Sequence, residues 1–416
     1  MHTKISRGVS VIITVSVLII GLSCSENKSG AYVTGDYPNL FVELLGKEVP
    51  DVNVKVNRAW NQLFYGDDQE ERVFYPAGFD MAYIEDILHH DVRSEGMSYG
   101  MMIAVQLDKQ EEFDRLWKWA KTYMQHKNGK RKGYFAWQVS TEGTILDPNP
   151  ASDAEEYMVM SLFFAAARWG NGTGIYDYNA QAQAILEAML SKEEMSADTA
   201  VIINMFNKKE KQVVFVPFGD AGDFTDPSYH LPHFYVLWSQ WADTNQAFWA
   251  EAAFQSRAFF KQTAHPKTGL VPDYAHFNGS PKKVPWATGH EDFRFDAWRT
   301  IMNIAVDYVW FRREAWAVQQ CNRWLDFFYR QGMNSYASQY TLDGVPLSEY
   351  RSPGLIAMNA TACLASTHAR RAEFVDALWT LPVPSGLYRY YDGLLYLLGL
   401  LHTSGQFQIY ADALEP

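Results

Sequence analysis

Three acidic residues stand at the starts of predicted helices, where carboxylates can meet for catalysis. Glu95 begins a predicted helix over 94–107, Asp153 begins one over 153–168, and Asp296 lies in the first turn of one over 293–312. Each could simply complement a helix dipole or cap its helix. Two features favour a further role. Gly96, a poor helix former, follows Glu95 directly, and Asp296 lies in an apolar helix where an unpaired carboxylate is costly.

Paired carboxylates in an aromatic cleft are suited to glycoside hydrolysis. One carboxylic acid protonates the leaving oxygen, while a carboxylate activates water or attacks the sugar. Aromatic residues make up 15% of the chain, and several lie on predicted loops, where core packing explains them less well than it explains aromatics on helices. These loop residues are Tyr134, Phe135, Trp137, Trp286, Tyr340 and Tyr350. Their flat apolar faces predict a cleft that binds sugar rings.

The charge balance of the chain narrows the class of ligand. The 36 Lys and Arg residues against 48 Asp and Glu residues give a net charge of −12, and the one basic cluster is a short, turn-like segment over 127–132. A protein with this balance is a poor candidate for binding nucleic acid. It also lacks the positive charge that sugars bearing carboxylates or sulfates would need. We therefore expect a neutral oligosaccharide as ligand.

The elements that must position these residues are mostly helical. Apolar residues recur at helical spacing in twelve segments. The segments are 52–64, 94–107, 110–126, 153–168, 176–190, 229–242, 246–263, 293–312, 315–331, 353–368, 371–380 and 388–402. Convincing strands are few, the best being 134–139 and 213–217. The pattern predicts an all-α fold with a few short strands in loops.

The twelve predicted helices come in closely connected pairs, and this favours a closed (α/α)6 barrel. The even-numbered member of each pair is the more apolar one and is expected inside, while 110–126, 176–190 and 315–331 are amphipathic with charged outer faces. All candidate catalytic residues, as well as the segments that begin at Tyr229 and Tyr388, open even-numbered helices. In a barrel of hairpins those starts share one end. An open helical solenoid is the alternative, although no fixed repeat period is present.

The N-terminus is typical of an export signal. Lys4 and Arg7 precede an apolar run over 9–22, and small residues lead to Cys24 and a polar stretch. We expect residues 1–23 to be a lipoprotein-type signal peptide, Cys24 to carry lipid, 24–31 to be a flexible tether, and 32–416 to form a single catalytic domain. An uncleaved anchor helix is the alternative. The protein is then exported and lipid-anchored in the bacterial cell envelope, at the periplasm or the outer membrane.

Several of these segments together resemble glycoside hydrolase family 8. The stretch SEGMSYGM over 94–101 is the strongest match. The others are 104–106, 113–117, 147–157, 226–232, 295–299 and 390–395. The resemblance covers nearly the whole mature chain, and it implies an inverting hydrolase on an (α/α)6 barrel. Carried over by motif, Glu95 is the general acid, Asp296 is the general base, and Asp153 holds the distorted sugar between them.

The resemblance also implies that Tyr229 would help to place the attacking water. Helical spacing, by contrast, indicates Arg299 as the partner of Asp296, three residues before it, unless Arg299 forms only a surface pair. A helix N-terminus lowers the pKa of an acid such as Glu95, so burial and the negative charge of Asp153 would have to raise it. The remaining candidates for substrate binding are Trp137, Tyr350, Arg351, Tyr388 and Tyr391.

Within the family the chain looks most like enzymes that release xylose from the reducing end of xylo-oligosaccharides. Those enzymes close the cleft with a Leu-His-Pro segment, whereas this chain has Tyr350-Arg351-Ser352 at the corresponding place. We expect Arg351 to donate to the reducing-end hydroxyls and Tyr350 to wall the site. The enzyme should be a monomer without a cofactor or metal.

Other functions stay open at this point. An open cleft would instead make the chain an endo-acting xylanase or another beta-glucanase of the same family. A non-catalytic sugar-binding surface lipoprotein would need the aromatic residues but not the three carboxylates. A sugar epimerase on the same barrel would favour histidines as acid and base.

Overall fold

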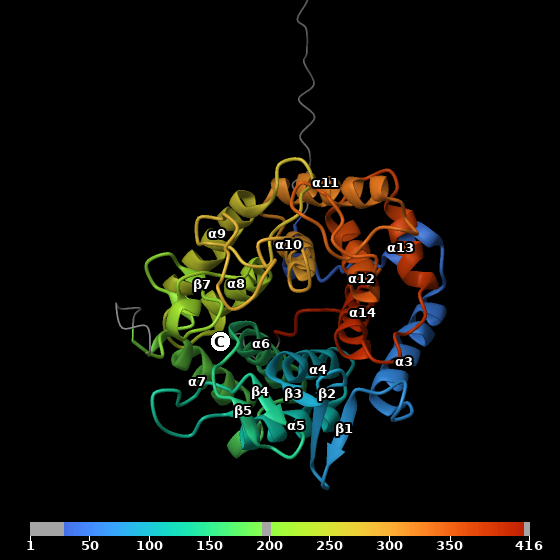
Figure 1. Cartoon of the computed structure of the whole chain (residues 1–416). Coiled ribbons are helices and arrows are strands. Elements are labelled where there is room, and N and C mark those ends of the chain that lie inside the picture. Colours follow the sequence, from blue (N-terminus) through green and yellow to red (C-terminus); the bar gives the residue numbers. More distant parts are fainter. Residues whose placement is uncertain (1–28, 194–200, 412–416) are drawn as a thin grey trace, which may run out of the picture.

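The computed structural model describes residues 29–193 and 201–411. The predicted signal peptide and Cys24 lie outside these residues. Within them, six inner helices and six outer helices form two concentric rings (Figure 1). The inner helices are α4 (Ser94–Gln106), α6 (Ser152–Trp169), α8 (Pro232–Trp241), α10 (Ala297–Phe311), α12 (Pro353–Ala362) and α14 (Arg389–Thr403). The outer helices are α3 (Val49–Tyr65), α5 (Gln110–Trp119), α7 (Tyr178–Leu190), α9 (Gln246–Thr263), α11 (Ala315–Gln331) and α13 (Arg371–Thr380).

The chain closes on itself because the last inner helix packs against the first. Helix α14 contacts both α12 and α4, and α4 continues the ring to α6. This closure excludes the open solenoid and confirms the predicted (α/α)6 barrel. Two further short helices, α1 (Ala31–Thr34) and α2 (Leu40–Leu45), precede the twelve predicted ones.

The inner and outer helices differ in sequence as predicted. Every residue of α14 from Leu394 to Leu401 is buried, because this helix is surrounded by other elements on all sides. Helix α5 instead buries Phe113, Leu116 and Trp117 on one face and exposes Glu111 to solvent. An amphipathic helix gains stability only from its apolar face, so it covers the barrel from outside.

A small antiparallel sheet, which the sequence patterns did not reveal, supports the start of α4. Its strands β1 (Phe74–Ala77), β2 (Met81–Asp86), β3 (Asp91–Arg93), β4 (Gln138–Ser140) and β5 (Ile145–Asp147) pair in chain order. A two-stranded ribbon, β6 (Phe206–Asn207) with β7 (Gln212–Val213), is separate. The predicted strands 134–139 and 213–217 were therefore largely misplaced. Most of these strands are too short to show an alternating pattern.

Two predicted helix starts were also wrong. Helix α8 begins at Pro232 rather than at residue 229, and Tyr229 lies in a short 3-10 turn, Pro227–Tyr229. Helix α10 begins at Ala297 rather than at residue 293, and Asp296 is its N-cap residue. Phe295, just before it, has a positive φ of 37°. In both places the residues just before the inner helix form a turn, whereas the sequence pattern predicted that they belong to the helix.

The opposite end of the barrel is sealed by the two ends of the described chain. Gly30 and Ala31 are buried, and the Tyr32 ring lies 5.4 Å from that of Phe311 at the end of α10. From the other terminus, the ring of Phe407 stacks on His402 with a centroid distance of 4.0 Å. Folded structure thus includes the last residues of the predicted tether over 24–31. The N-terminal ends of the inner helices are left for the site.

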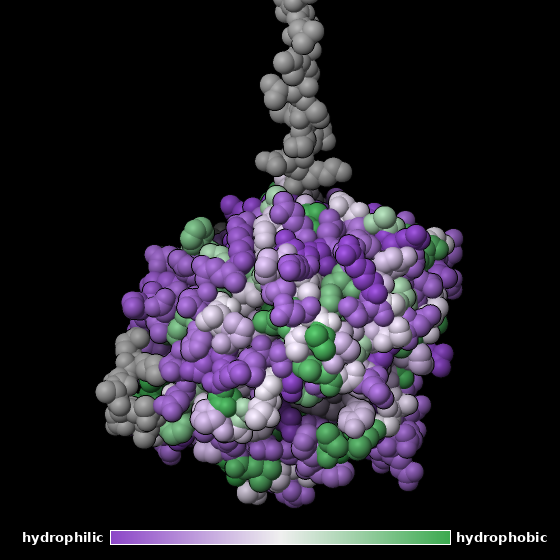
Figure 2. Space-filling model, turned by 45° about the horizontal axis from the view of Figure 1, so that its top comes forward, coloured by the Kyte–Doolittle hydropathy of each residue, from purple (hydrophilic) through white to green (hydrophobic). Residues whose placement is uncertain are grey.

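The surface is mixed in character. Figure 2 shows a mainly hydrophilic face on which hydrophobic residues form small, separate groups. Within the residues that the structure describes, no helix has the length and apolar character needed to cross a membrane.

Candidate active site

One guanidinium gathers the three predicted catalytic carboxylates at the N-terminal end of the inner helices. Arg299 Nη1 lies 3.1 Å from Glu95 Oε2 and 2.8 Å from Asp153 Oδ2, and Arg299 Nη2 lies 3.1 Å from Asp296 Oδ1. The guanidinium also donates to the hydroxyls of Tyr99 and Ser228. Arg299 is 2% exposed, so it is not the surface pair that the sequence left possible. The structure confirms Asp296 as its partner and adds Glu95 and Asp153.

Glu95 lies in the first turn of α4, where β3 runs directly into the helix. The backbone N–H of Ser94 donates to the carbonyl of Trp137, and this fixes the entry of the chain. The side chain is 18% exposed, and its Oε1 accepts a hydrogen bond from the Tyr390 hydroxyl at 3.1 Å. Gly96 is required here because the Tyr390 ring lies against its backbone. This is the close approach that a glycine in a first helical turn suggested.

Burial makes Glu95 suitable as an acid. Desolvation raises its pKa from 4.5 to about 8, and this outweighs the lowering by Arg299, with Asp296 and Asp153 adding to the rise. The conflict between a helix N-terminus and a catalytic acid is thus resolved mainly by burial. At neutral pH this carboxyl keeps its proton and can give it to a leaving oxygen.

Asp153 lies in the first turn of α6 and is 3% exposed. Its Oδ2 accepts from Arg299, but its Oδ1 has no hydrogen-bond partner among the described residues. Burial raises the pKa of this carboxyl to about 6 despite the nearby guanidinium. A buried oxygen without a partner is costly unless something donates to it, and a sugar hydroxyl would do so.

Asp296 is the most accessible of the three carboxylates, with its side chain 26% exposed. Its Oδ1 accepts from the Tyr391 hydroxyl at 3.2 Å and faces Arg299. Glu95 and Asp296 therefore contact different nitrogens of one guanidinium.

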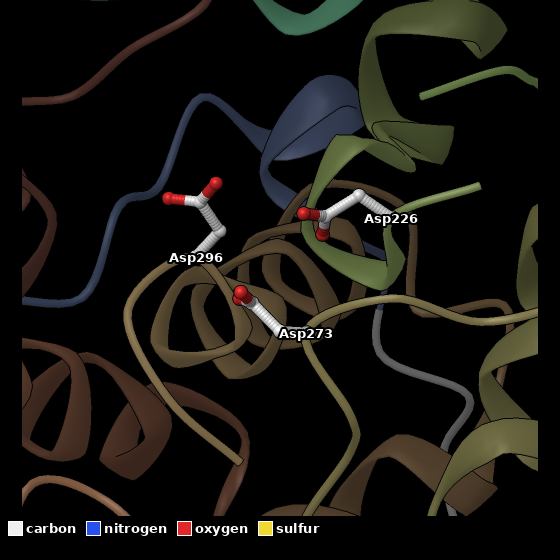
Figure 3. Close-up of side chains that lie close together, drawn as sticks. All are labelled: Asp226, Asp273 and Asp296. Carbon is white, nitrogen blue, oxygen red and sulfur yellow. The ribbon is translucent and has the colours of Figure 1, made fainter. Parts of the chain in front are cut away.

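Two further carboxylates, which the sequence analysis did not single out as functional, adjoin Asp296. Figure 3 shows Asp226 and Asp273 pointing toward it, and one oxygen of each of the three residues lies within 4.8 Å of the others. Three oxygens so placed could also surround a metal ion. Asp226 belongs to one of the segments that carry the family resemblance. Asp273 lies on an irregular loop, where neither spacing nor periodicity marks it.

The aromatic candidates lie at different distances from the carboxylates. Tyr229 is buried with its ring 5.7 Å from the Arg299 guanidinium, and Tyr391 contacts Asp296 directly. Trp137 is partly buried with the Arg93 guanidinium over its ring. Tyr350 and Tyr388 are 47% and 55% exposed, and their rings lie 5.7 Å apart at the starts of α12 and α14. These two residues form an exposed aromatic pair at the end of the barrel that holds the carboxylates.

Arg351 contacts other parts of the chain, and its expected hydrogen bond to the substrate stays a prediction. Its Nη2 donates to the carbonyl of Met333 at 2.7 Å, and its guanidinium lies over the Tyr336 ring at 4.8 Å. The side chain is therefore held against the protein by these two contacts. Tyr350, the preceding residue, donates to Asp392 Oδ2 at 2.5 Å and keeps its exposed position. Neighbouring residues on an irregular loop point in different directions, which sequence order alone does not reveal.

The chain is similar to a known protein family, to characterised enzymes and to solved structures. The family model described as "Glycosyl hydrolases family 8" matches residues 87–405. The reducing-end xylose-releasing exo-oligoxylanase Rex8A of Paenibacillus barcinonensis is 44% identical over 384 residues, covering 92% of this chain and 98% of that protein. A second enzyme with that activity in its name, from Halalkalibacterium halodurans, is 40% identical over 92% of this chain and 97% of its own length. A solved xylanase of Teredinibacter turnerae, a catalytic mutant with xylohexaose, has a TM-score of 0.89 at 45% identity, covering 92% of this chain and all of that one.

Proposed function

Because the chain belongs to glycoside hydrolase family 8, we propose that it releases xylose from the reducing end of xylo-oligosaccharides with inversion of configuration. The observation that carries this proposal is the convergence of Glu95, Asp153 and Asp296 on Arg299. Membership of a hydrolase family argues against the alternatives of a non-catalytic sugar-binding protein and an epimerase.

The proposed reaction uses the two carboxyl groups on opposite sides of the scissile bond. Asp296 removes a proton from a water molecule as the water oxygen attacks the anomeric carbon. Glu95 gives its proton to the leaving oxygen as the glycosidic bond breaks. Each turnover thus protonates Asp296 and deprotonates Glu95, and exchange with solvent restores both. Asp153, through its unpartnered Oδ1, would hold a hydroxyl of the sugar at the reacting centre.

The choice of a neutral, uncharged sugar agrees with the charges of the site. Arg299 is already engaged by carboxylates, so no free cation faces the ligand from this residue. Exposed rings such as Tyr350 and Tyr388 can pack against the apolar faces of sugars. The related exo-oligoxylanases, which match over nearly their whole length, support xylose as the sugar.

A second candidate function is internal cleavage of xylan. Arg351, which was expected to donate to the reducing-end hydroxyls, instead contacts Met333 and Tyr336. A xylanase of Teredinibacter turnerae is as similar to this chain as the exo-acting relatives are. Tyr350 alone would then have to close the cleft beyond the released xylose.

Incubation with xylohexaose labelled at its reducing end distinguishes the two modes. Early label found in xylose alone supports reducing-end release. Early label in xylobiose or xylotriose rejects it in favour of internal cleavage. A mock preparation from cells that do not express the enzyme serves as the control, since any label that it releases comes from a contaminating enzyme. Xylan polymer should be a poor substrate in the first case and a good one in the second.

We also propose, from the N-terminal sequence, that the enzyme is an exported lipoprotein that acts as a monomer. Lipid attachment at Cys24 would hold the barrel at the cell envelope. Metabolic labelling with a radioactive fatty acid should mark the wild-type protein and not Cys24→Ser. Light scattering of a form lacking residues 1–24 should give the mass of one chain.

A further inference from the structure

Asp226 and Asp273 are more deeply buried than the catalytic residue that they adjoin. Asp226 is 0% exposed and Asp273 is 1% exposed, and both carboxyl groups point toward Asp296 (Figure 3). Three ionised carboxylates at this spacing would repel one another strongly, because little water is present to screen them. Arg299 forms an ion pair with Asp296, but its single positive charge is shared with Glu95 and Asp153. The cluster therefore needs a further source of neutralisation.

The hydrogen bonds of the two buried residues are unequal. Asp273 Oδ1 accepts the backbone N–H of Ala297 at 3.1 Å, and its Oδ2 lies 2.6 Å from His290 Nδ1. Asp226 Oδ1 accepts the backbone N–H of Ser228 at 2.7 Å, but its Oδ2 has no partner among the described residues. A carboxylate whose oxygens both receive N–H donors is stabilised in its ionised form. An oxygen that receives no donor is the natural place for a proton.

We propose that Asp226 keeps a proton at the working pH, while Asp273 stays ionised, and that the two act as positioning residues for Asp296. This inference rests on the proposed function, in which Asp296 is the general base. The neutral acid limits the repulsion on Asp296. The ionised Asp273 holds the N–H of Ala297, the residue that follows Asp296, and thereby fixes the turn that presents the base.

Burial and the charged and titratable groups around the cluster act on both carboxyl groups. Burial raises the pKa of the Asp226 carboxyl, and the charges of Asp296 and Asp273 raise it further. Burial also lowers the pKa of His290, so this ring is neutral and can supply an N–H to Asp273. Burial, and then the charge of Asp296, also raise the pKa of the Asp273 carboxyl, whereas the N–H of Ala297, Arg299 and Arg294 oppose this rise. The hydrogen bonds, and not burial, therefore distinguish Asp273 from Asp226. The remaining groups that face the cluster are neutral phenols, Tyr229, Tyr274 and Tyr391.

Matched amide variants test the two charge states separately. Asp226→Asn replaces a neutral acid with a neutral amide, so the acidic limb of the kcat/KM profile should stay in place. Asp273→Asn removes a negative charge beside Asp296 while keeping an oxygen for Ala297. Its acidic limb should move down by about one pH unit, because a neighbouring charge of this kind shifts ionisation by that order. Asp220→Asn, at an exposed site, controls for a general charge effect and should move neither limb.

Equal downward shifts in Asp226→Asn and Asp273→Asn would overturn the proposal, since Asp226 would then be ionised. An unmoved limb in Asp273→Asn would also overturn it. Asp296→Asn tests the proposed function separately: substantial activity in that variant would refute Asp296 as the base, whatever the protonation of Asp226.

Carbon NMR of the wild-type enzyme, labelled at the aspartate carboxyl carbons, tests the proton directly even if a variant does not fold. At pH 7 one aspartate signal should remain in the protonated range, and it should be missing from Asp226→Asn. Ionised signals alone at pH 7 would reject the proposal. Addition of Ca²⁺ or Mg²⁺ gives a further check. A rise in Tm that Asp226→Asn abolishes would show that a cation, not a proton, neutralises the cluster.

Discussion

The ring of Tyr390 lies so close to the backbone of Gly96 that a Cβ atom at Gly96 would come within 2.4 Å of Tyr390 Cε2. The same ring directs its hydroxyl to Glu95 Oε1 at 3.1 Å. The absence of a side chain at one position thus allows α14 to present a hydrogen-bond donor to the proposed catalytic acid on α4.

Gly96→Ala should therefore damage both stability and activity. We expect a loss of about 1–3 kcal/mol in the free energy of unfolding from overpacking, and a fall in kcat, because the Tyr390 ring must leave Glu95. Thermal or urea unfolding measures the first effect. In a Tyr390→Ala background the same change should instead stabilise by up to about 1 kcal/mol, since alanine is the better helix former. Equal effects in both backgrounds would mean that the contact is unimportant.

The pKa of Glu95 predicts how stability depends on pH. Because burial raises that pKa from 4.5 to about 8, the folded state holds a proton that the unfolded state has released between these pH values. The free energy of unfolding therefore falls as pH rises through this range. Glu95→Gln removes the ionisation, so its Tm should exceed that of the wild type by an amount that grows from pH 5 to pH 8.

A matched substitution at an exposed glutamate, Glu111→Gln, should show no such growth in the Tm difference. The same pKa predicts that kcat/KM of the wild type declines above about pH 8, when the acid loses its proton. Tyr390→Phe should move this alkaline limb to higher pH, because a donor to the ionised carboxylate is lost while the ring remains. A limb that moves down instead would contradict the assigned hydrogen bond.

The two catalytic carboxyl groups should respond differently to the leaving group. Loss of a general acid or base costs roughly 10²–10⁴ in rate. Asp296→Asn should show such a loss in kcat for every substrate, because water attack is always needed. Glu95→Gln should recover much of its activity on a substrate whose leaving group needs no proton. Steady-state kinetics on both kinds of substrate measures this contrast, and identical losses for Glu95→Gln on both would argue against its role as acid.

The roles assigned to Glu95 and Asp296 predict the stereochemical outcome. Inverting enzymes place their carboxyl groups about 6.5–9.5 Å apart so that water fits beside the sugar. Proton NMR at early times should show the first-formed anomer with inverted configuration. Net retention would rule out Asp296 as a base that activates water.

Tyr350 and Arg351 are adjacent in sequence, but they should have opposite effects when replaced by alanine. Arg351→Ala removes the bond to Met333 and the packing on Tyr336, which should cost about 1.5–3 kcal/mol of stability and leave the product pattern unchanged. Tyr350→Ala removes an exposed ring and should shift label from xylose to longer fragments. Product analysis of labelled xylohexaose, together with Tm, separates the two. A changed product pattern in Arg351→Ala would mean that this side chain does reach the substrate.

Several properties of this protein follow from the sequence because they depend on local spacing. Apolar residues at helical intervals predict the twelve barrel helices, since a helix must bury one face or, inside a barrel, all of its faces. The same spacing places Glu95 and Asp153 in first helical turns, and it places Asp296 next to the start of α10. Closely paired helices predict a ring in which those starts meet at one end.

Other properties depend on contacts between residues far apart in the chain, and only the tertiary structure decides them. Arg299 can be paired with Asp296 from the sequence, because three residues separate them on a helix. Its contacts with Glu95 and Asp153 depend on how α4 and α6 close around α10. Asp273 lies on a loop without periodicity, and Arg351 turns inward on another. Irregular backbone has no repeating geometry, so the direction of a loop side chain is set by the packing around it.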